Sequence, residues 1–143
     1  GRLEGSPQLV KAGGHRFTDV SVVSPTLMQS VSLINLASVR DLGRKIGREL
    51  DPLRFRANLY VEGWPAWVEN DWTGRTLSVG GATAEVIKPI VRCAATHVDP
   101  DTGQRDADLV KALFDHYGHM FCGIYLTVTS GGVVGEGDGV ALT

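Results

Sequence analysis

The chain has 143 residues, of which 43% are hydrophobic and 21% are charged, and its formal net charge is -2. At this length roughly 70% of the unfolded surface can be buried, which excludes a mini-protein that depends on disulfides or a structural metal. No apolar run approaches the roughly 20 residues that a membrane-spanning helix needs. No block of like charges favours nucleic acid as a partner.

The cysteine content and the first residues of the sequence predict a compartment. Cys93 and Cys122 do not form the cysteine framework of a secreted domain, and no basic region followed by an apolar one opens the chain. We therefore expect a cytoplasmic protein. Because Gly1 rather than Met is the first residue, we expect residues 1–14 to be an edge or a fragment of a longer chain and residues 15–143 to form one domain.

The first half of the chain predicts strands around one helix. Short apolar runs bounded by turn residues indicate strands over 8–11, 16–23 and 30–34, with a turn at Gly13-Gly14. Asn35 is an acceptable N-cap, and apolar residues then recur at helical spacing. This pattern predicts a helix over 36–49 that stops before Asp51-Pro52 and has Arg40, Arg44, Lys45 and Arg48 on its outward face.

The second half is richer in strand signals. Extended patterns cover 55–61, 76–79 and 83–90, with a hairpin at Gly80-Gly81, and a β-branched and aromatic run covers 120–129. Residues 99–103 have the composition of a turn, residues 106–117 have one apolar helical face that ends at Gly118, and a Gly-rich hairpin spans 131–139. We therefore expect an α+β domain, mainly β, whose curled mixed sheet forms a barrel with two helices.

Cys93 is a candidate reactive or metal-ligating thiol. It follows Arg92, and Lys88 lies five residues upstream on the same extended run. A neighbouring cation favours the thiolate, which is the form that attacks, carries sulfur or binds a metal. The alternative is an inert small hydrophobic residue at the end of a strand.

Three polar residues between Arg54 and Asn58 form a second candidate group. On a strand, Arg54, Arg56 and Asn58 would share one face because strand side chains alternate. Two guanidinium groups and an amide on one face suit a phosphate or another planar oxyanion. The alternative is a solvated strand face whose arginines pair with carboxylates such as Glu62 or Asp71.

Other patterns in the sequence are weaker evidence for a binding site. A calcium loop at Asp99-x-Asp101-x-Gly103 fails because the sixth and twelfth positions are Gln104 and Val110, so a rigid turn is expected. The three-residue spacing of His116, His119 and Cys122, with Cys93 as a fourth group, matches none of the usual zinc patterns. Trp64, Trp67 and Trp72 lie in a Gly- and Pro-containing stretch that indicates a loop packed on the core.

An ordered series of motifs resembles the MOSC domain, the family named for the C-terminal domain of molybdenum cofactor sulfurases. The motifs are Arg54-Phe-Arg-Ala-Asn-Leu-Tyr-Val-Glu-Gly63, Trp67-Val-Glu-Asn-Asp-Trp72, Val91-Arg-Cys-Ala-Ala-Thr-His-Val-Asp-Pro-Asp-Thr-Gly103, Phe121-Cys-Gly-Ile-Tyr125 and Gly135-Glu-Gly-Asp-Gly139. The resemblance covers about residues 15–142. It implies a β-rich barrel-like fold. It also implies that the domain binds a molybdopterin-type cofactor or handles sulfur destined for it.

The resemblance also implies roles for individual residues. In the amidoxime-reducing relatives the cysteine of the Arg-Cys motif ligates molybdenum, and this motif falls on Arg92 and Cys93. The Arg-x-Asn element falls on Arg56 and Asn58, which would hold the pterin and its phosphate, with Arg54 beside them. Val91 stands where that branch commonly has Ser. Full-length relatives usually carry a further N-terminal β-barrel portion, which we expect to be absent here.

Three functions follow as hypotheses. In the first, the domain binds the molybdenum cofactor with Cys93 as the metal ligand and belongs to a reductase of N-hydroxylated compounds. Such a reductase would need a redox partner protein, because the sequence has no flavin, haem or iron–sulfur motif. In the second, Cys93 carries persulfide sulfur from a cysteine desulfurase to a metal centre. The family's association with pyridoxal phosphate then belongs to the fused desulfurase domain. In the third, the domain is a non-catalytic interaction module.

Overall fold

A computed structural model describes residues 7–10 and 30–143 of the chain. The strand and turn expected within 13–23 lie outside the described residues. The strands are β1 (Gln8–Val10), β2 (Val31–Asn35), β3 (Leu59–Glu62), β4 (Thr76–Val79), β5 (Ala82–Val91), β6 (Phe121–Ser130) and β7 (Val140–Leu142). The α-helices are α3 (Leu36–Ile46) and α4 (Leu109–Tyr117), and the short 3-10 helices are η1 (Pro52–Phe55), η2 (Val68–Asp71) and η3 (Ala94–His97).

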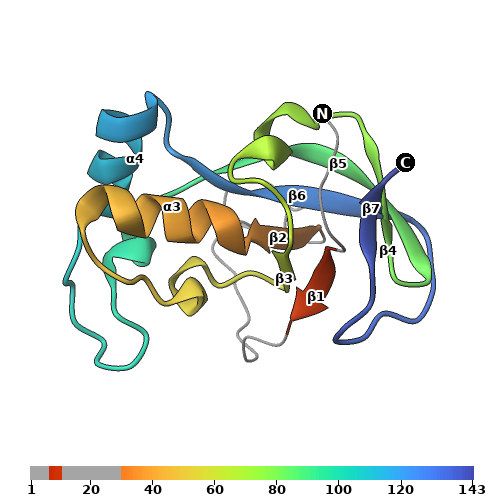
Figure 1. The fold of residues 1–143 in the computed structure, drawn as a ribbon, viewed down its shortest axis with the longest axis horizontal. Coiled ribbons are helices and arrows are strands. Elements are labelled where there is room, and N and C mark those ends of the chain that lie inside the picture. The colour runs from red at the N-terminus through yellow and green to blue at the C-terminus, as the bar shows by residue number, and fades with distance from the viewer. Residues whose placement is uncertain (1–6, 11–29) are drawn as a thin grey trace.

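The seven strands of the described residues form one mixed sheet in the order β1-β3-β2-β6-β5-β4-β7. Only the pair β2 and β3 is parallel among these neighbours. The two ends of the sheet meet, because the Leu9 N–H donates to the Asp138 carbonyl at 2.9 Å and the Val140 N–H donates to the Pro7 carbonyl at 3.0 Å. The sheet is therefore curled and nearly closed, as Figure 1 shows, with α3 and α4 grouped at one end. This architecture confirms the predicted fold class.

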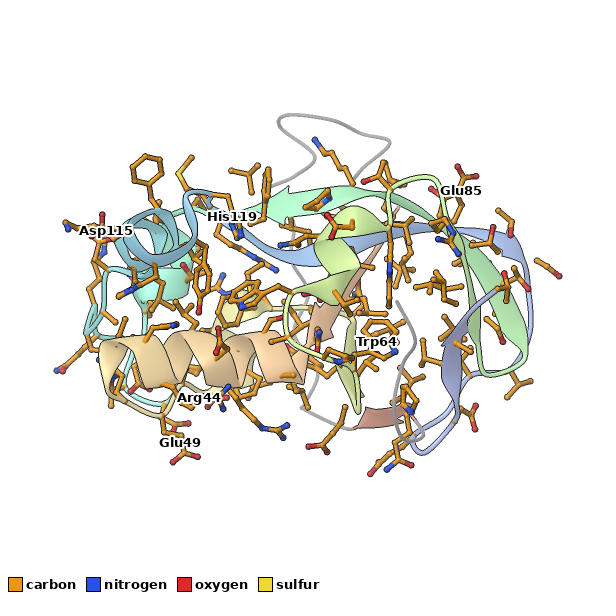
Figure 2. All side chains as sticks on the ribbon, turned by 45° about the horizontal axis from the view of Figure 1, so that its top comes forward. Arg44, Glu49, Trp64, Glu85, Asp115 and His119 are labelled. Atoms are coloured by element: carbon orange, nitrogen blue, oxygen red, sulfur yellow. The ribbon has the colours of Figure 1, made fainter. Side chains whose placement is uncertain are left out.

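The sheet separates two apolar cores. The inner core fills the curled sheet and includes Trp64 and Trp72, whose rings meet edge to face at 4.9 Å. The outer core lies between the other face of β2, β3 and β6 and the two helices, and includes Ile34, Leu42 and Leu113. Figure 2 shows Trp64 inside the curled sheet and Arg44 on the outer side of α3. The prediction that the tryptophan-containing stretch packs on the core is confirmed.

Helix α3 is shorter than the predicted helix over 36–49. The Asn35 side chain caps its start by accepting from the Ala37 N–H at 3.0 Å, as expected. The helix ends at Gly47, which is in the left-handed conformation with φ 73° and donates its N–H back to the Arg44 carbonyl. Glycine takes this conformation without the strain that a Cβ introduces, so it sets the end of the helix.

Gly47→Ala is expected to lower the free energy of unfolding by about 1 kcal/mol, because alanine at positive φ is strained. Apart from the adjoining backbone, no atom of the described residues lies within 4 Å of the position that a Cβ would occupy, so the loss has no steric component. Urea denaturation measures it. Gly131→Ala is the control, since its added Cβ also meets open space and its φ is outside the left-handed region. Equal effects of the two substitutions would contradict the backbone explanation.

The predicted strand over 55–61 is wrong in its first half. The Asp51 carboxylate accepts from the Leu53 N–H at 2.9 Å and, with Pro52 at the first position, starts the 3-10 helix η1. Arg56 then has φ 49°, and the strand begins only at Leu59. Arg54, Arg56 and Asn58 therefore do not share one face of a strand.

Helix α4 also begins later than the predicted residue 106. The carboxylate of Asp108 caps it by accepting from the Lys111 N–H at 3.0 Å. Residues 98 and 105 instead form an isolated β-bridge around the turn at Asp99. The Asp99 carboxylate accepts from the N–H groups of Asp101 and Thr102, which confirms the predicted rigid turn.

Candidate functional site

The guanidinium group of Arg92 is the central feature of the site. Arg92 is only 9% exposed, its Nε donates to the Cys122 carbonyl at 2.7 Å, and its Nη1 donates to the Phe55 carbonyl at 3.0 Å. The buried Nη2 has no hydrogen-bond partner among the described residues. Burial lowers the pKa of Arg92, and the groups that act on it electrostatically are cysteines and tyrosines rather than carboxylates. Arg92 is thus a buried cation without a carboxylate partner in the described part of the chain.

Gly123 provides the space for this guanidinium. Its φ is 88°, and an added Cβ would lie 3.1 Å from Arg92 Nη2 and only 2.7 Å from Ile34 Cδ1. A side chain at this position would therefore collide with its neighbours and displace the arginine. The glycine of the Phe121–Tyr125 motif has a steric role in the site.

Cys93 lies where β5 has ended and η3 is about to begin. Its side chain is exposed, and its carbonyl accepts from the Thr96 N–H at 3.1 Å and from the Thr96 hydroxyl at 2.9 Å. These two bonds fix the backbone of the turn that carries the thiol. Val91, two residues before Cys93, is 56% exposed. Cys93 is accessible to a ligand or a reaction partner, unlike a cysteine packed in the core.

Asn58 is held in one orientation beside β2. Its Oδ1 accepts from the Ser32 N–H at 2.9 Å and from the Ser32 hydroxyl at 3.0 Å. Its side-chain NH2 group, which donates to no described residue, is available to a ligand. Arg56 is exposed and follows Phe55, whose carbonyl holds Arg92. Arg56 is therefore next in sequence to a residue whose backbone holds Arg92, whereas Asn58 contacts Ser32 of β2.

Tyr125 is a polar residue of this region that the sequence analysis did not assign. It lies two residues after Gly123 on the outer face of β6, and it is 9% exposed. Strand register places it opposite Ser32 of β2 and Lys88 of β5. Burial raises the pKa of Tyr125, Arg92 lowers it and Cys93 raises it. The available signal was the apolar pair Ile124 and Leu126, which places Tyr125 on the opposite face.

Arg54 has a different environment from the one expected. Its Nη1 and Nη2 donate to the two carboxylate oxygens of Asp106 at 2.7 and 2.6 Å, and Nη1 also reaches the Thr96 carbonyl at 3.4 Å. Arg48 binds the same carboxylate at 2.7 Å. The two arginines hold the pKa of Asp106 well below its ordinary value. The alternative of an arginine paired with a carboxylate thus applies to Arg54, although the partner is neither Glu62 nor Asp71.

The groups considered for zinc have other environments. Burial raises the pKa of the Cys122 thiol to about 12. The His119 ring lies between Tyr117 and Phe121, with centroids at 5.7 and 5.2 Å, and its Nδ1 accepts from the Phe121 N–H. Within residues 7–10 and 30–143 no group of three or more His, Cys, Asp or Glu side chains could hold a metal ion.

Comparison with known proteins identifies the family. The sequence matches the MOSC domain over residues 12–141, and the chain belongs to this family. It is 39% identical to the molybdenum cofactor sulfurase of Caenorhabditis elegans over 102 residues, which are 68% of this chain and 14% of that protein. It is 30% identical to mouse mitochondrial amidoxime-reducing component 1 over 74 residues, which are 52% of this chain and 21% of that protein. The chain thus spans a small part of the length of these relatives.

Solved structures share the fold. YiiM from Geobacillus stearothermophilus aligns with a TM-score of 0.57 and 21% identity over 79% of this chain and 53% of that one. The YuaD protein from Bacillus subtilis aligns with a TM-score of 0.58 and 14% identity over 95% of this chain and 84% of that one.

No helix in the described ranges combines the length and the hydropathy needed to cross a membrane.

Proposed function

We propose that this MOSC domain binds a molybdenum cofactor of the molybdopterin type, with Cys93 as the metal ligand and Arg56, Asn58 and Arg92 as contacts for the pterin and its phosphate. The observation that carries the proposal is the buried Arg92 guanidinium, whose Nη2 has no described partner, next in sequence to an exposed thiol. An uncompensated buried charge is unfavourable, and an anionic ligand removes the penalty.

The residues present fit such a group. The side-chain nitrogens of Arg56, Asn58 and Arg92 that lack a partner among the described residues are all hydrogen-bond donors, as an anionic and carbonyl-rich ligand requires. A thiolate is a suitable ligand for a metal that also takes sulfur ligands. Arg54 supports the site indirectly, since it contacts the Thr96 carbonyl in the turn that follows Cys93.

The names of the relatives support the cofactor as well, because they include molybdenum cofactor sulfurases and amidoxime-reducing components. When bound, the cofactor would supply a molybdenum centre for two-electron chemistry. The chain itself would ligate the metal through Cys93 and orient the pterin through Arg56 and Asn58. Reduction of an N-hydroxylated compound would require electrons from a separate redox partner protein.

The exposure of Cys93 favours sulfur transfer as the second candidate function. The Cys93 thiolate would attack the outer sulfur of a persulfide on a cysteine desulfurase, and the desulfurase cysteine would leave as a thiolate. Delivery of the outer sulfur of the new Cys93 persulfide to a metal centre as sulfide would take two electrons from an external dithiol reductant and would return Cys93 as a thiolate. A non-catalytic barrel is disfavoured, since it gives no reason for a buried arginine whose Nη2 has no partner among the described residues.

Protein from a host that makes the cofactor tests the proposal. We expect stoichiometric molybdenum and pterin in the wild type, and their loss in Cys93→Ala with the free energy of unfolding unchanged within about 0.5 kcal/mol. Elemental analysis, pterin fluorescence after release and urea denaturation provide the three readouts.

Cys122→Ala is the matched control. Cys122 is buried, so the Cys122→Ala variant is expected to retain the metal but to lose about 1 kcal/mol in its free energy of unfolding. This is the reverse of the result expected for Cys93→Ala. A wild-type protein without molybdenum would contradict cofactor binding. Mass spectrometry after incubation with a cysteine desulfurase and cysteine would then decide whether Cys93 gains a sulfur atom.

A further inference from the structure

We propose that His97 is a positioning residue for Cys93: its imidazole ties the turn that carries the thiol to the start of helix α4 in both of its protonation states, by exchanging one partner there for another. The inference deepens the proposed function and rests on it, because this turn presents the thiol that would ligate the metal. No role was assigned to His97 from the sequence.

The turn after Cys93 is a single short 3-10 helix that runs from the thiol to the imidazole. Cys93 is the residue that precedes η3, and His97 is its last residue. The Cys93 carbonyl accepts from the N–H and the hydroxyl of Thr96. Arg54 Nη1 donates to the Thr96 carbonyl, and the Asp106 N–H donates to the His97 carbonyl. A shift of His97 is therefore passed through these bonds to the backbone of Cys93.

The His97 ring faces the first turn of α4. Its Nε2 lies 3.3 Å from the Val110 nitrogen and 3.2 Å from Asp108 Oδ1. The N–H groups of a first helical turn have no acceptor within the helix. A neutral ring with its proton on Nδ1 accepts the Val110 N–H, as the Asp108 carboxylate accepts the Lys111 N–H. The imidazole is thus a second cap of α4, supplied by η3.

Protonation of the ring exchanges its partner. A charged imidazole carries a proton on both nitrogens, so Nε2 can no longer accept from Val110 and instead donates to the Asp108 carboxylate. Both partners belong to the start of α4, so the ring stays tied to the same place. Histidine changes its charge within the range between pH 5 and 8, where an anchor with one partner would fail.

Asp108 is the charged group that decides the behaviour of the protonated ring. Within the described part of the chain it is the group at ion-pair distance from His97, and it forms no other ion pair there. The carboxylate of Asp106 is bound by two arginines, and Lys111 pairs with Asp115. The other charged residues that border the turn are Arg48, Arg54, Asp99, Arg105, Asp106 and Lys111.

Amide hydrogen exchange of the cofactor-free chain tests the anchor. The protection of the Thr96 and Val110 N–H groups is measured by NMR on either side of the His97 titration, which the nitrogen shifts of the ring report. We expect His97→Leu to lower the protection of both amides about fivefold in both states, as the loss of one capping interaction predicts. His116→Leu, an exposed histidine of the same helix, is the matched control and should leave both amides unchanged.

Two conservative variants separate the two partners. Asp108→Asn keeps an oxygen that caps α4 but removes the charge, so it is expected to lower protection about fivefold only where His97 is protonated. His97→Gln supplies an amide that can accept from Val110 and donate to Asp108 without titrating, so it is expected to keep the wild-type protection on both sides. These two variants test the anchor even if His97→Leu does not fold.

The outcomes distinguish this inference from the proposed function. Unchanged protection of Thr96 in His97→Leu would overturn the anchor, and an Asp108→Asn effect of equal size on both sides of the titration would overturn the exchange of partners. Both results are read without the cofactor, so a wild type that lacks molybdenum contradicts the proposed function alone. In protein from a host that makes the cofactor, His97→Leu is expected to retain less molybdenum than His116→Leu, and equal retention would contradict the positioning role.

Discussion

Glu69→Ala is expected to lower the free energy of unfolding by about 3 kcal/mol, because it leaves buried donors without an acceptor and opens a cavity. Glu69 is fully buried, and its Oε2 accepts from Asn35 Nδ2 at 2.8 Å while its Oε1 accepts from the Ser38 hydroxyl at 2.9 Å. Ser38 in turn accepts from the Trp67 N–H. This network ties η2 to the first turn of α3, and urea denaturation measures its loss.

The pH dependence of this loss has a defined sign. Burial raises the pKa of Glu69 above the ordinary value of 4.5, so between that value and the folded-state pKa the folded chain holds the proton that the unfolded chain releases. The contribution of Glu69 is therefore largest below pH 4.5 and decreases as the pH rises through the folded-state pKa. The difference between wild type and Glu69→Ala is expected to shrink from pH 4.5 upward, and a difference that grows would contradict this explanation.

Arg54→Met is expected to lower the free energy of unfolding by about 2 kcal/mol, since it removes a buried guanidinium with a bidentate bond to Asp106 and a contact with Thr96. Asp106 keeps Arg48 as a partner, so its charge is not left alone. Arg54→Lys keeps the charge without the bidentate geometry and is expected to recover less than half of the loss. Thermal and urea denaturation of the two variants provide the measurement.

Arg44→Met is the control for Arg54. The Arg44 side chain is 69% exposed and pairs with Asp41 on the same helix, an arrangement that contributes about 0.5 kcal/mol or less. Equal stability of the Arg54 and Arg44 variants would show that the bidentate pair is not structurally important.

The stabilisation by the Arg54–Asp106 pair also depends on pH. The arginines lower the pKa of Asp106, so the stabilisation from the ionised carboxylate is present above the ordinary pKa of an aspartate and is lost as the pH falls toward the folded-state pKa.

Local sequence patterns predict most of this fold. The hairpin at Gly80-Gly81, the apolar spacing of α3 and the β-branched run of β6 each depend on neighbours close in sequence, and the observed elements match them within one to three residues. The errors occur where a cap decides the boundary. Gly47 ends α3 early, Asp108 starts α4 late, and Asp51 with Pro52 starts a 3-10 helix where alternation indicated a strand.

The candidate site is less accessible to sequence reasoning. Arg92 and Cys93 are adjacent in the chain, and the family motif marks them. Arg54 meets Asp106 across 52 residues, and no local pattern predicts that pairing. The position of Tyr125 beside Lys88 depends on register shifts between β5 and β6, which alternation alone does not predict. Contacts that depend on strand register and on distant ion pairs need the folded structure.

The meeting of β1 with the segment before β7 also affects how the protein is made. Pro7 and Leu9 form backbone bonds with residues 137–140, so this closure joins parts of the chain separated by nearly its whole length. Contacts of such high sequence separation form slowly because a long loop must first be closed. During translation the strands up to β6 can pair before the segment at 137–142 leaves the ribosome. The nascent domain therefore exposes the edges of β1 and β4, and part of the inner core, until this segment has left the ribosome.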